Sequence, residues 1–243
     1  YMEGMIMFSN RKYAFTLAEV LVTLGIIGVV SAMTVPSLMQ NYQKQSYVTQ
    51  LHKVYNELTQ GFMQIVTDRN ALNLAETGIT RAQDMMPLMK KYFKVIQDCD
   101  TAPTPCFADT YRNINGGSHS LSTRGGKCGV LASGASFCIF ADVLDVGTVM
   151  TDDFFLQLWI DINGQKGPNI YGRDLFSMYV YPDGVIDDYM VNPECRINGN
   201  CNGGGTVRDY RETLFAECLS NAGSTLPKGC FGKILNDNWE MNY

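Results

Sequence analysis

The sequence predicts an α+β protein, in which a long N-terminal α-helix leads into a head built on a small antiparallel β-sheet with disulfide-tied loops. Three observations support this prediction. Phe15–Val35 is an almost uninterrupted apolar run, and an apolar stripe with helical spacing follows it. Beyond Cys99 the pattern changes to short runs of aromatic and β-branched residues, and every cysteine lies at or after this position.

The composition narrows the class of protein. The chain has 243 residues, 46% of them hydrophobic and 18% charged, which is typical of a globular protein. Its formal net charge of -5 gives no general attraction to phosphate backbones, so we expect no nucleic-acid partner. The only two histidines, His52 and His119, exclude a His-rich metal site. Eight cysteines in a loop-rich region favour disulfides formed outside the cytoplasm.

The apolar run has the properties of a transmembrane helix. A helix over Phe15–Val35 would be about 30 Å long, close to the thickness of a bilayer core. Glu19 is its single charged residue, and Arg11 and Lys12 precede it. Because a positive flank stays on the cytoplasmic side, the rest of the chain is expected on the opposite side of the membrane.

The helical pattern continues beyond the apolar run. A stripe spaced by three and four residues predicts one long helix over 15–66, of which 15–35 spans the membrane, followed by a head over 67–243. Pro36 predicts a kink or local melting between the two halves. The stripe consists of Val48, Leu51, Tyr55, Leu58, Phe62 and Ile65.

The start of the chain resembles the processing site of type IV pilins and type II secretion pseudopilins. The resemblance lies in Arg11-Lys12-Tyr13-Ala14 followed by Phe15-Thr16-Leu17-Ala18-Glu19-Val20-Leu21. It implies that residues 1–14 are a leader and that a prepilin peptidase cuts between Ala14 and Phe15 and methylates the new amine. Ala14 stands where the family usually has Gly. Gly28 and Pro36 fall where family members often carry helix-weakening residues.

The resemblance also implies a pilin-like fold and a structural function. The chain would be held in the cytoplasmic (inner) membrane as a single-pass subunit with its head outside the cytoplasm, and would then enter a periplasmic or extracellular filament. The implied partners are other subunits through helix–helix packing, the prepilin peptidase/methyltransferase, an inner-membrane assembly machinery with an ATPase, and the lipid bilayer. No cofactor is implied.

The position of Glu19 suggests a role in assembly. A carboxylate inside an apolar helix is rarely kept without a partner. No Lys or Arg lies between Lys12 and Lys44, so the cation at its depth would be the new amine of Phe15, in the same subunit or a neighbouring one. That pairing would set the axial register between subunits. A carboxylate that simply reaches toward the headgroups is the alternative.

A second interpretation starts from an ordinary signal peptide. Val30-Ser31-Ala32 would satisfy a signal peptidase, and cleavage after Ala32 would release a secreted or membrane-anchored extracellular binding protein, adhesin or enzyme. Glu19 interrupts the required uncharged region, which is also longer than usual. The chain has no G-x-S-x-G, P-loop, H-E-x-x-H or C-x-x-C motif, so an enzyme is not expected. An adhesin or tip subunit remains open.

Short strands and sequential disulfides are expected in the head. Strands are predicted around 130–131, 137–140, 154–162, 175–181 and 185–186, and a loop-rich region after Asn192. Short loops close at the lowest entropic cost, so neighbouring cysteines are expected to pair. The expected pairs are Cys99 with Cys106, Cys128 with Cys138, Cys195 with Cys201, and Cys218 with Cys230.

The loop after the strand at 154–162 allows two interpretations. Alternating Asp161 and Asn163 followed by Gly164, with Asp174 downstream, is similar to the opening of a calcium loop. No Glu closes the loop at the twelfth position, so a structural loop with an Asx turn is the alternative. The neighbouring carboxylates Asp187 and Asp188 are expected in a solvated turn.

Overall fold

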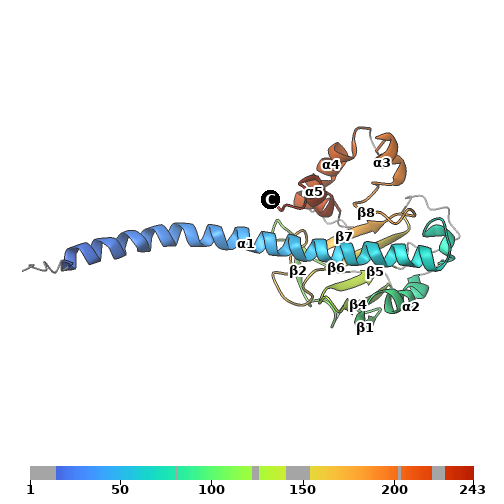
Figure 1. Cartoon of the computed structure of the whole chain (residues 1–243), viewed down its shortest axis with the longest axis horizontal. Coiled ribbons are helices and arrows are strands. Elements are labelled where there is room, and N and C mark those ends of the chain that lie inside the picture. The colour runs from blue at the N-terminus through green and yellow to red at the C-terminus, as the bar shows by residue number, and fades with distance from the viewer. Residues whose placement is uncertain (1–14, 80–81, 122–125, 141–153, 202–203, 221–227) are drawn as a thin grey trace, which may run out of the picture. The chain divides into compact units, whose positions relative to one another are not determined.

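The computed structural model describes residues 15–79, 82–121, 126–140, 154–201, 204–220 and 228–243. These residues confirm the α+β class, with a long N-terminal helix and an antiparallel sheet (Figure 1). The helices are α1 (Leu17–Asp68), η1 (Ala75–Thr77), α2 (Ala82–Tyr92), α3 (Pro193–Asn198), α4 (Val207–Ser220) and α5 (Cys230–Asn236). The strands are β1 (Val95–Asp100), β2 (Tyr111–Arg112), β3 (Ser118–His119), β4 (Lys127–Leu131), β5 (Ser136–Ile139), β6 (Leu156–Asp161), β7 (Leu175–Val180) and β8 (Ile186–Asp187).

Helix α1 differs from its prediction at both ends and at its proline. It begins at Leu17 rather than at residue 15, and ends at Asp68 rather than at 66. Pro36 lies inside the continuous helix, so the expectation of local melting was wrong. Contacts group the chain into two compact units, Tyr1–Gln43 and Lys44–Tyr243. Within the second unit, α1 buries its apolar stripe, from Val48 to Ile65.

The head contains a six-stranded antiparallel sheet in the order β1-β4-β5-β6-β7-β8, and β2 pairs with β3 separately. The predicted strands correspond to β4 through β8. The sequence predicts a second, shorter helix through Ile96, and therefore no strand β1, because Ile96 continues the helical spacing of Met89, Tyr92 and Phe93. Helix α2 instead ends at Tyr92, and β1 pairs with β4.

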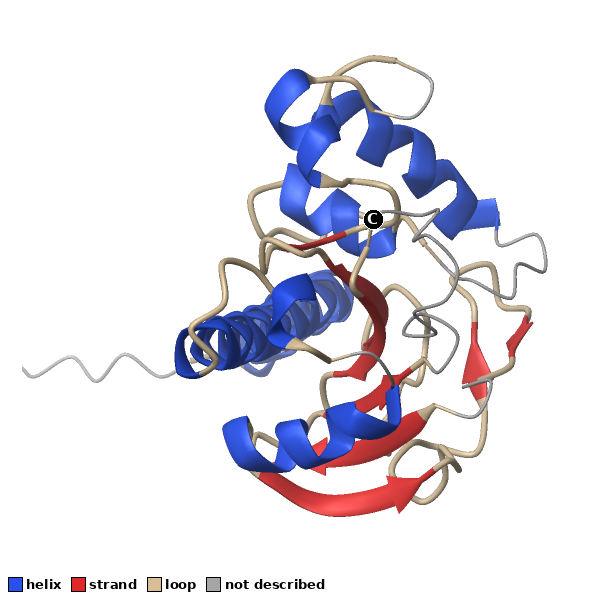
Figure 2. Cartoon of the chain, turned by 90° about the vertical axis from the view of Figure 1, so that its right-hand side faces the viewer, coloured by secondary structure: helices blue, strands red, loops and turns tan. Residues whose placement is uncertain are grey.

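The C-terminal half of α1 and helix α2 lie on the same face of the sheet (Figure 2). All residues of β6 and β7 are buried, as expected for central strands that are covered on both faces. Gly61 allows the ring of Phe93 to pack closely against helix α1, because a Cβ at this position would lie 2.1 Å from Cε1 of Phe93. Phe62 and Phe93 also meet edge to face, with ring centroids 5.5 Å apart.

The region after Asn192 is largely helical rather than loop-rich, which corrects the prediction. Asn192 caps α3 by accepting a hydrogen bond from Cys195 N–H, and α4 buries Tyr210, Leu214 and Cys218 at a spacing of four. The cysteines form the four sequential pairs favoured by their spacing: Cys99–Cys106, Cys128–Cys138, Cys195–Cys201 and Cys218–Cys230.

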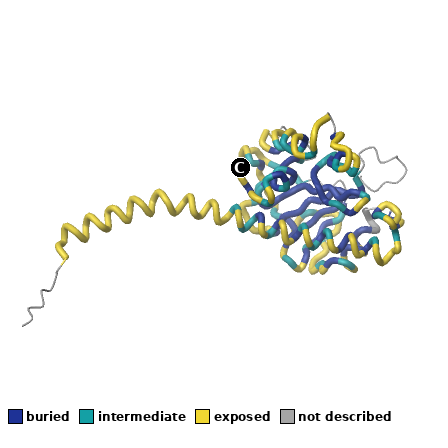
Figure 3. Tube along the Cα trace, turned by 45° about the horizontal axis from the view of Figure 1, so that its top comes forward, coloured by how far each residue is buried: buried dark blue, intermediate teal, exposed yellow. Residues whose placement is uncertain are grey.

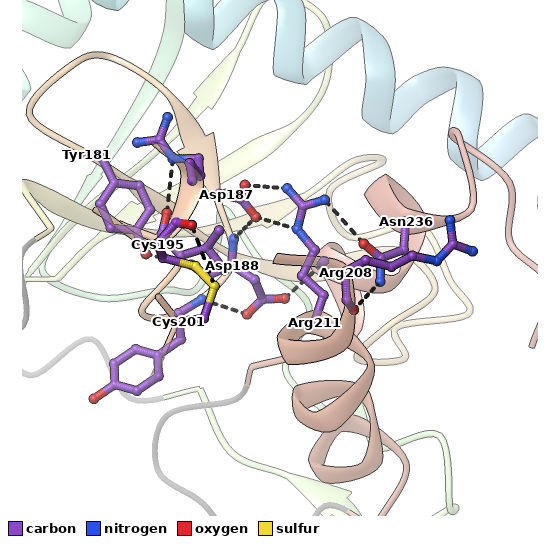
Figure 4. Close-up of polar contacts among 12 residues, drawn as sticks. Tyr181, Asp187, Asp188, Cys195, Cys201, Arg208, Arg211 and Asn236 are labelled. Atoms are coloured by element: carbon purple, nitrogen blue, oxygen red, sulfur yellow. Dashed lines mark hydrogen bonds and ion pairs between the residues drawn. A yellow bond between two sulfur atoms is a disulfide. The ribbon is translucent and has the colours of Figure 1, made fainter. Parts of the chain in front are cut away.

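Two buried carboxylates attach the C-terminal helices to the sheet (Figure 4). Asp187 forms a two-pronged ion pair with Arg211 of α4. Asp188 accepts hydrogen bonds from the N–H groups of Gly229, at 2.9 Å, and Gly232, at 2.7 Å, next to the start of α5. The expectation of a solvated turn was therefore wrong, because these carboxylates replace water with fixed hydrogen-bond donors.

Candidate processing and assembly site

The first residues of α1 form a reciprocal hydrogen-bonded cap. Thr16 donates to Oε2 of Glu19 through its backbone N–H, at 2.9 Å, and through its hydroxyl, at 2.8 Å. The N–H of Glu19 donates in return to Oγ1 of Thr16, at 3.2 Å. This arrangement is a capping box, which satisfies backbone donors that have no partner in the first helical turn.

The hydrogen bonding between Thr16 and Glu19 was not predicted, although the sequence contains the signal. A Thr followed three residues later by Glu, just before an apolar run, is the signature of a capping box. Glu19 therefore has a local partner in the isolated chain. Its carboxylate caps the N-terminus of α1 at Thr16. The preceding residue, Phe15, is 87% exposed.

The apolar half of α1 is not covered by any part of the chain that the structure describes. Every residue from 15 to 43 is exposed (Figure 3). By length and composition α1 can cross a membrane, and it is the one such helix in the described ranges. An exposed apolar surface of this length fits membrane anchoring.

The remaining predicted residues of this site lie on the same helix or before it. Gly28 is helical, and a Cβ built on it would have no atom within 4 Å. Pro36 is also helical, although it has no N–H for the helical ladder. Ala14, Arg11 and Lys12 lie outside the described residues.

The two carboxylates of the second candidate site are occupied by the protein itself. Asp161 accepts hydrogen bonds from the N–H of Asn163, at 3.0 Å, and from the hydroxyl of Tyr111, at 2.5 Å. Asp174 accepts from the N–H groups of Asn169, at 2.7 Å, and Ile170, at 2.6 Å. The Asp161–Asn163 contact is an Asx turn. The described residues contain no group of three or more potential metal ligands.

Burial changes the protonation of these groups. It raises the pKa of Asp161 to about 7, and the hydrogen bond from Tyr111 acts in the opposite direction. Burial also raises the pKa of Asp174, against the hydrogen bonds from Ile170 and Asn169. The hydrogen bonds of the two carboxylates connect the end of β6 to Tyr111 and hold the backbone at Asn169 and Ile170 before β7.

The side chain of His119 is held by Asn113 and Tyr171. Its Nδ1 lies 2.7 Å from Oδ1 of Asn113, and its ring stacks on Tyr171 with centroids 5.3 Å apart. Burial lowers its pKa to about 4. An amide and an aromatic ring therefore orient the imidazole.

Comparison with known families identifies the N-terminal segment. Residues 9–35 match the family described as the prokaryotic N-terminal methylation motif. No curated protein and no solved structure matches this chain. The matched range contains Phe15, the Thr16–Glu19 cap and the apolar half of α1, so the motif and the exposed helix coincide.

Proposed function

We propose that this chain, a type IV pilin-like protein by its N-terminal motif, is a structural subunit of a type IV pilus-like or type II secretion pseudopilus filament. One observation carries the proposal: the fully exposed apolar half of α1 begins with a capped turn beside Phe15, inside the matched motif. The role is structural rather than enzymatic. A prepilin peptidase/methyltransferase would cut between Ala14 and Phe15 and methylate the amine.

The subunit would wait in the cytoplasmic membrane with its head outside the cytoplasm. The apolar half of α1 would leave lipid and pack against the same segment of other subunits. Because lipid tails are as apolar as the side chains of α1, this exchange has little hydrophobic driving force. Extraction into a periplasmic or extracellular filament therefore requires an energy source, such as an assembly machinery with an ATPase.

Glu19 would exchange its hydrogen-bonding partner during assembly. In the isolated chain its Oε2 accepts two hydrogen bonds from Thr16. In the filament it would pair with the amine of Phe15 from a neighbouring subunit, because a buried carboxylate is stabilised more by a cation than by neutral donors. Four residues of helix separate the two groups, so neighbours would be offset by about 6 Å along the helix.

Intact-mass measurement on membrane-extracted protein tests the processing step. We expect a mature chain that begins at Phe15 and carries one N-methyl group. A chain that begins at Met33 would instead identify an ordinary signal peptide and overturn the filament proposal. Deletion of the prepilin peptidase should leave the leader attached.

Two substitutions distinguish the helix-capping role of Glu19 from the role of its negative charge. Glu19→Gln keeps an acceptor for Thr16 and removes the negative charge, whereas Glu19→Ala removes both. If Glu19 pairs with the amine, both variants should insert in the membrane, and both should lose filament incorporation at least tenfold relative to wild type. Normal incorporation of Glu19→Gln would assign Glu19 to helix capping alone.

A further inference from the structure

We infer that the cavity between the loop 103–110 and the β2–β3 hairpin is a binding site for a small neutral saccharide. The cavity has a volume of about 350 Å³, near the lower end of the range for small-molecule sites, about 300–1,000 Å³. All of its lining residues lie between Pro103 and Leu121, within the compact unit Lys44–Tyr243. Binding at this cavity does not depend on filament assembly.

The loop wall of the cavity is fixed to the core of the head. The Cys99–Cys106 disulfide closes the start of the loop, and the carbonyl of Cys106 accepts a hydrogen bond from the hydroxyl of Ser136, at 2.6 Å. At the other end of the loop, the hydroxyl of Tyr111 donates to the buried carboxylate of Asp161, at 2.5 Å. Both ends of this wall are therefore held before a ligand arrives.

The hairpin wall is fixed by Asn113. Its Nδ2 donates to the carbonyl of Ser118, at 3.3 Å, which leaves its Oδ1 to accept from Nδ1 of His119, at 2.7 Å. His119 in turn stacks on Tyr171. Because the rest of the head holds both walls in place, a ligand would bind with little loss of conformational entropy in the protein.

The cavity contains hydroxyl groups that the protein itself does not use. Thr110, Ser118 and Ser120 line it, and their hydroxyls form no hydrogen bond with any residue in the described parts of the chain. A hydroxyl group can both donate and accept a hydrogen bond. These positions therefore match a ligand whose own polar groups also donate and accept.

The charge of the cavity disfavours anionic ligands. Asp109 is a lining residue that forms no ion pair with any other described residue, and the hydroxyl of Thr104 donates to its Oδ1 at 3.4 Å. Burial lowers the pKa of His119 to about 4, so this lining residue adds no positive charge at neutral pH. A carboxylate without a neighbouring cation repels phosphate and carboxylate groups and accepts hydrogen bonds from donors.

A sugar ring has the chemistry that this lining requires. Its hydroxyls can donate to Asp109 and exchange hydrogen bonds with the free hydroxyls of the cavity, and its C–H groups can contact the apolar surface of Pro103 and Leu121. An alkylammonium group could also pair with Asp109, but it has no acceptor for the hydroxyl donors. A neutral saccharide satisfies both the carboxylate and the hydroxyls.

Saturation-transfer NMR on the full chain in a zwitterionic, sugar-free detergent tests the inference. The probes are the methyl glycosides of glucose, galactose and mannose, with the matching uronates as anions of the same shape and methylammonium as the cation. We expect at least one glycoside to bind saturably, with a millimolar dissociation constant. The matching uronate should bind at least fivefold more weakly, because Asp109 repels its carboxylate.

Three substitutions assign the binding to this cavity. Thr110→Val removes a cavity hydroxyl at nearly constant shape, and Thr213→Val does the same at an exposed position of α4 outside the cavity. Both variants should melt as wild type does. We expect Thr110→Val to weaken glycoside binding at least fivefold and Thr213→Val to leave it within twofold. Asp109→Asn should bring the affinity for the uronate to within twofold of that for the glycoside.

Several outcomes would overturn the inference. These are the failure of all three glycosides to bind, tighter binding of a uronate than of its glycoside, binding of methylammonium alone, wild-type affinity in Thr110→Val, equal loss in both Val variants, and unchanged discrimination in Asp109→Asn. None of them depends on the mature N-terminus or on filament incorporation, so the proposed function stands or fails separately.

Discussion

At the scale of single residues, the head contains buried carboxylates that accept hydrogen bonds from protein groups instead of from water. Asp161, Asp174 and Asp188 are fully buried, and each accepts at least two hydrogen bonds from the protein. Hydrogen bonds to a carboxylate are among the stronger ones, but burial opposes its charge. Burial accordingly raises the pKa of Asp161 to about 7 and that of Asp188 to about 6.

These raised pKa values predict how stability changes with pH. The protonated carboxyl of Asp161 stabilises the fold fully below about pH 4, near its pKa in the unfolded chain, and this contribution is lost as the pH rises through 7. Asp161→Asn cannot lose a proton. Relative to wild type, the variant should therefore gain unfolding free energy between pH 4 and pH 8, on the order of a few kcal/mol.

Denaturant unfolding of the detergent-solubilised chain at several pH values measures this change. Asp109→Asn, at an exposed position in the segment before Tyr111, is the control and should follow the wild-type pH profile. A constant difference between Asp161→Asn and wild type across the range would contradict the predicted role of burial.

The same contacts lead us to propose that the loop from Asp161 to Asp174 is structural rather than a calcium site. Backbone N–H groups occupy both carboxylates, and an ion would have to displace them. A calcium site at 100 times its dissociation constant would add about 2.7 kcal/mol of stability. We expect the melting temperature to be equal in millimolar calcium and in excess chelator, and an upward shift of several degrees with calcium would establish a site.

At the scale of elements, the approach of α1 to the α2–β1 connection depends on the absence of one side chain. A Cβ at Gly61 would lie 2.1 Å from Phe93, so Gly61→Ala requires the ring or the helix to move. This strain should lower the unfolding free energy by about 1–3 kcal/mol, which exceeds the gain of up to about 1 kcal/mol in helix propensity. Gly28→Ala, which has nothing within 4 Å, is the matched control on the same helix.

Chemical denaturation of both variants in detergent measures the difference. Gly28→Ala should leave the unfolding transition of the head at its wild-type midpoint, whereas Gly61→Ala should shift the midpoint to lower denaturant. Equal midpoints for the two variants would contradict the steric argument.

The elements also explain which features the sequence could predict. Local signals were sufficient for α1, for β4 through β8 and for the Phe15–Glu19 segment, because periodicity and turn residues lie within each segment. Strand β1 depends on pairing with β4, which overrides the helical spacing of Ile96. The burial of Asp187 depends on Arg211, which lies 24 residues away in the sequence, so it has no local signature.

At the scale of the whole molecule, four disulfides tie together short segments of the head. The four bridges close short loops, with sequence separations of 7, 10, 6 and 12 residues. Cys128 and Cys138 lie directly opposite each other on β4 and β5, in the centre of the core. The Cys218–Cys230 bridge joins α4 to α5, where Asp188 also holds the start of α5.

This arrangement predicts that the head folds only in an oxidising compartment. Loops of this length contribute about 2–3 kcal/mol per disulfide, against a total stability of about 5–15 kcal/mol for a typical domain. Reduction of all four bridges should therefore unfold the head at 37 °C, while the apolar half of α1 stays helical in detergent.

Limited proteolysis with and without a reductant measures this, because the reduced head should be digested at least tenfold faster. Replacing only Cys195 and Cys201 by Ser, at the peripheral bridge around α3, should leave the rest of the head resistant. A reduced chain as resistant as the oxidised one would mean that the core, with its buried stripe of α1, is sufficient without the bridges.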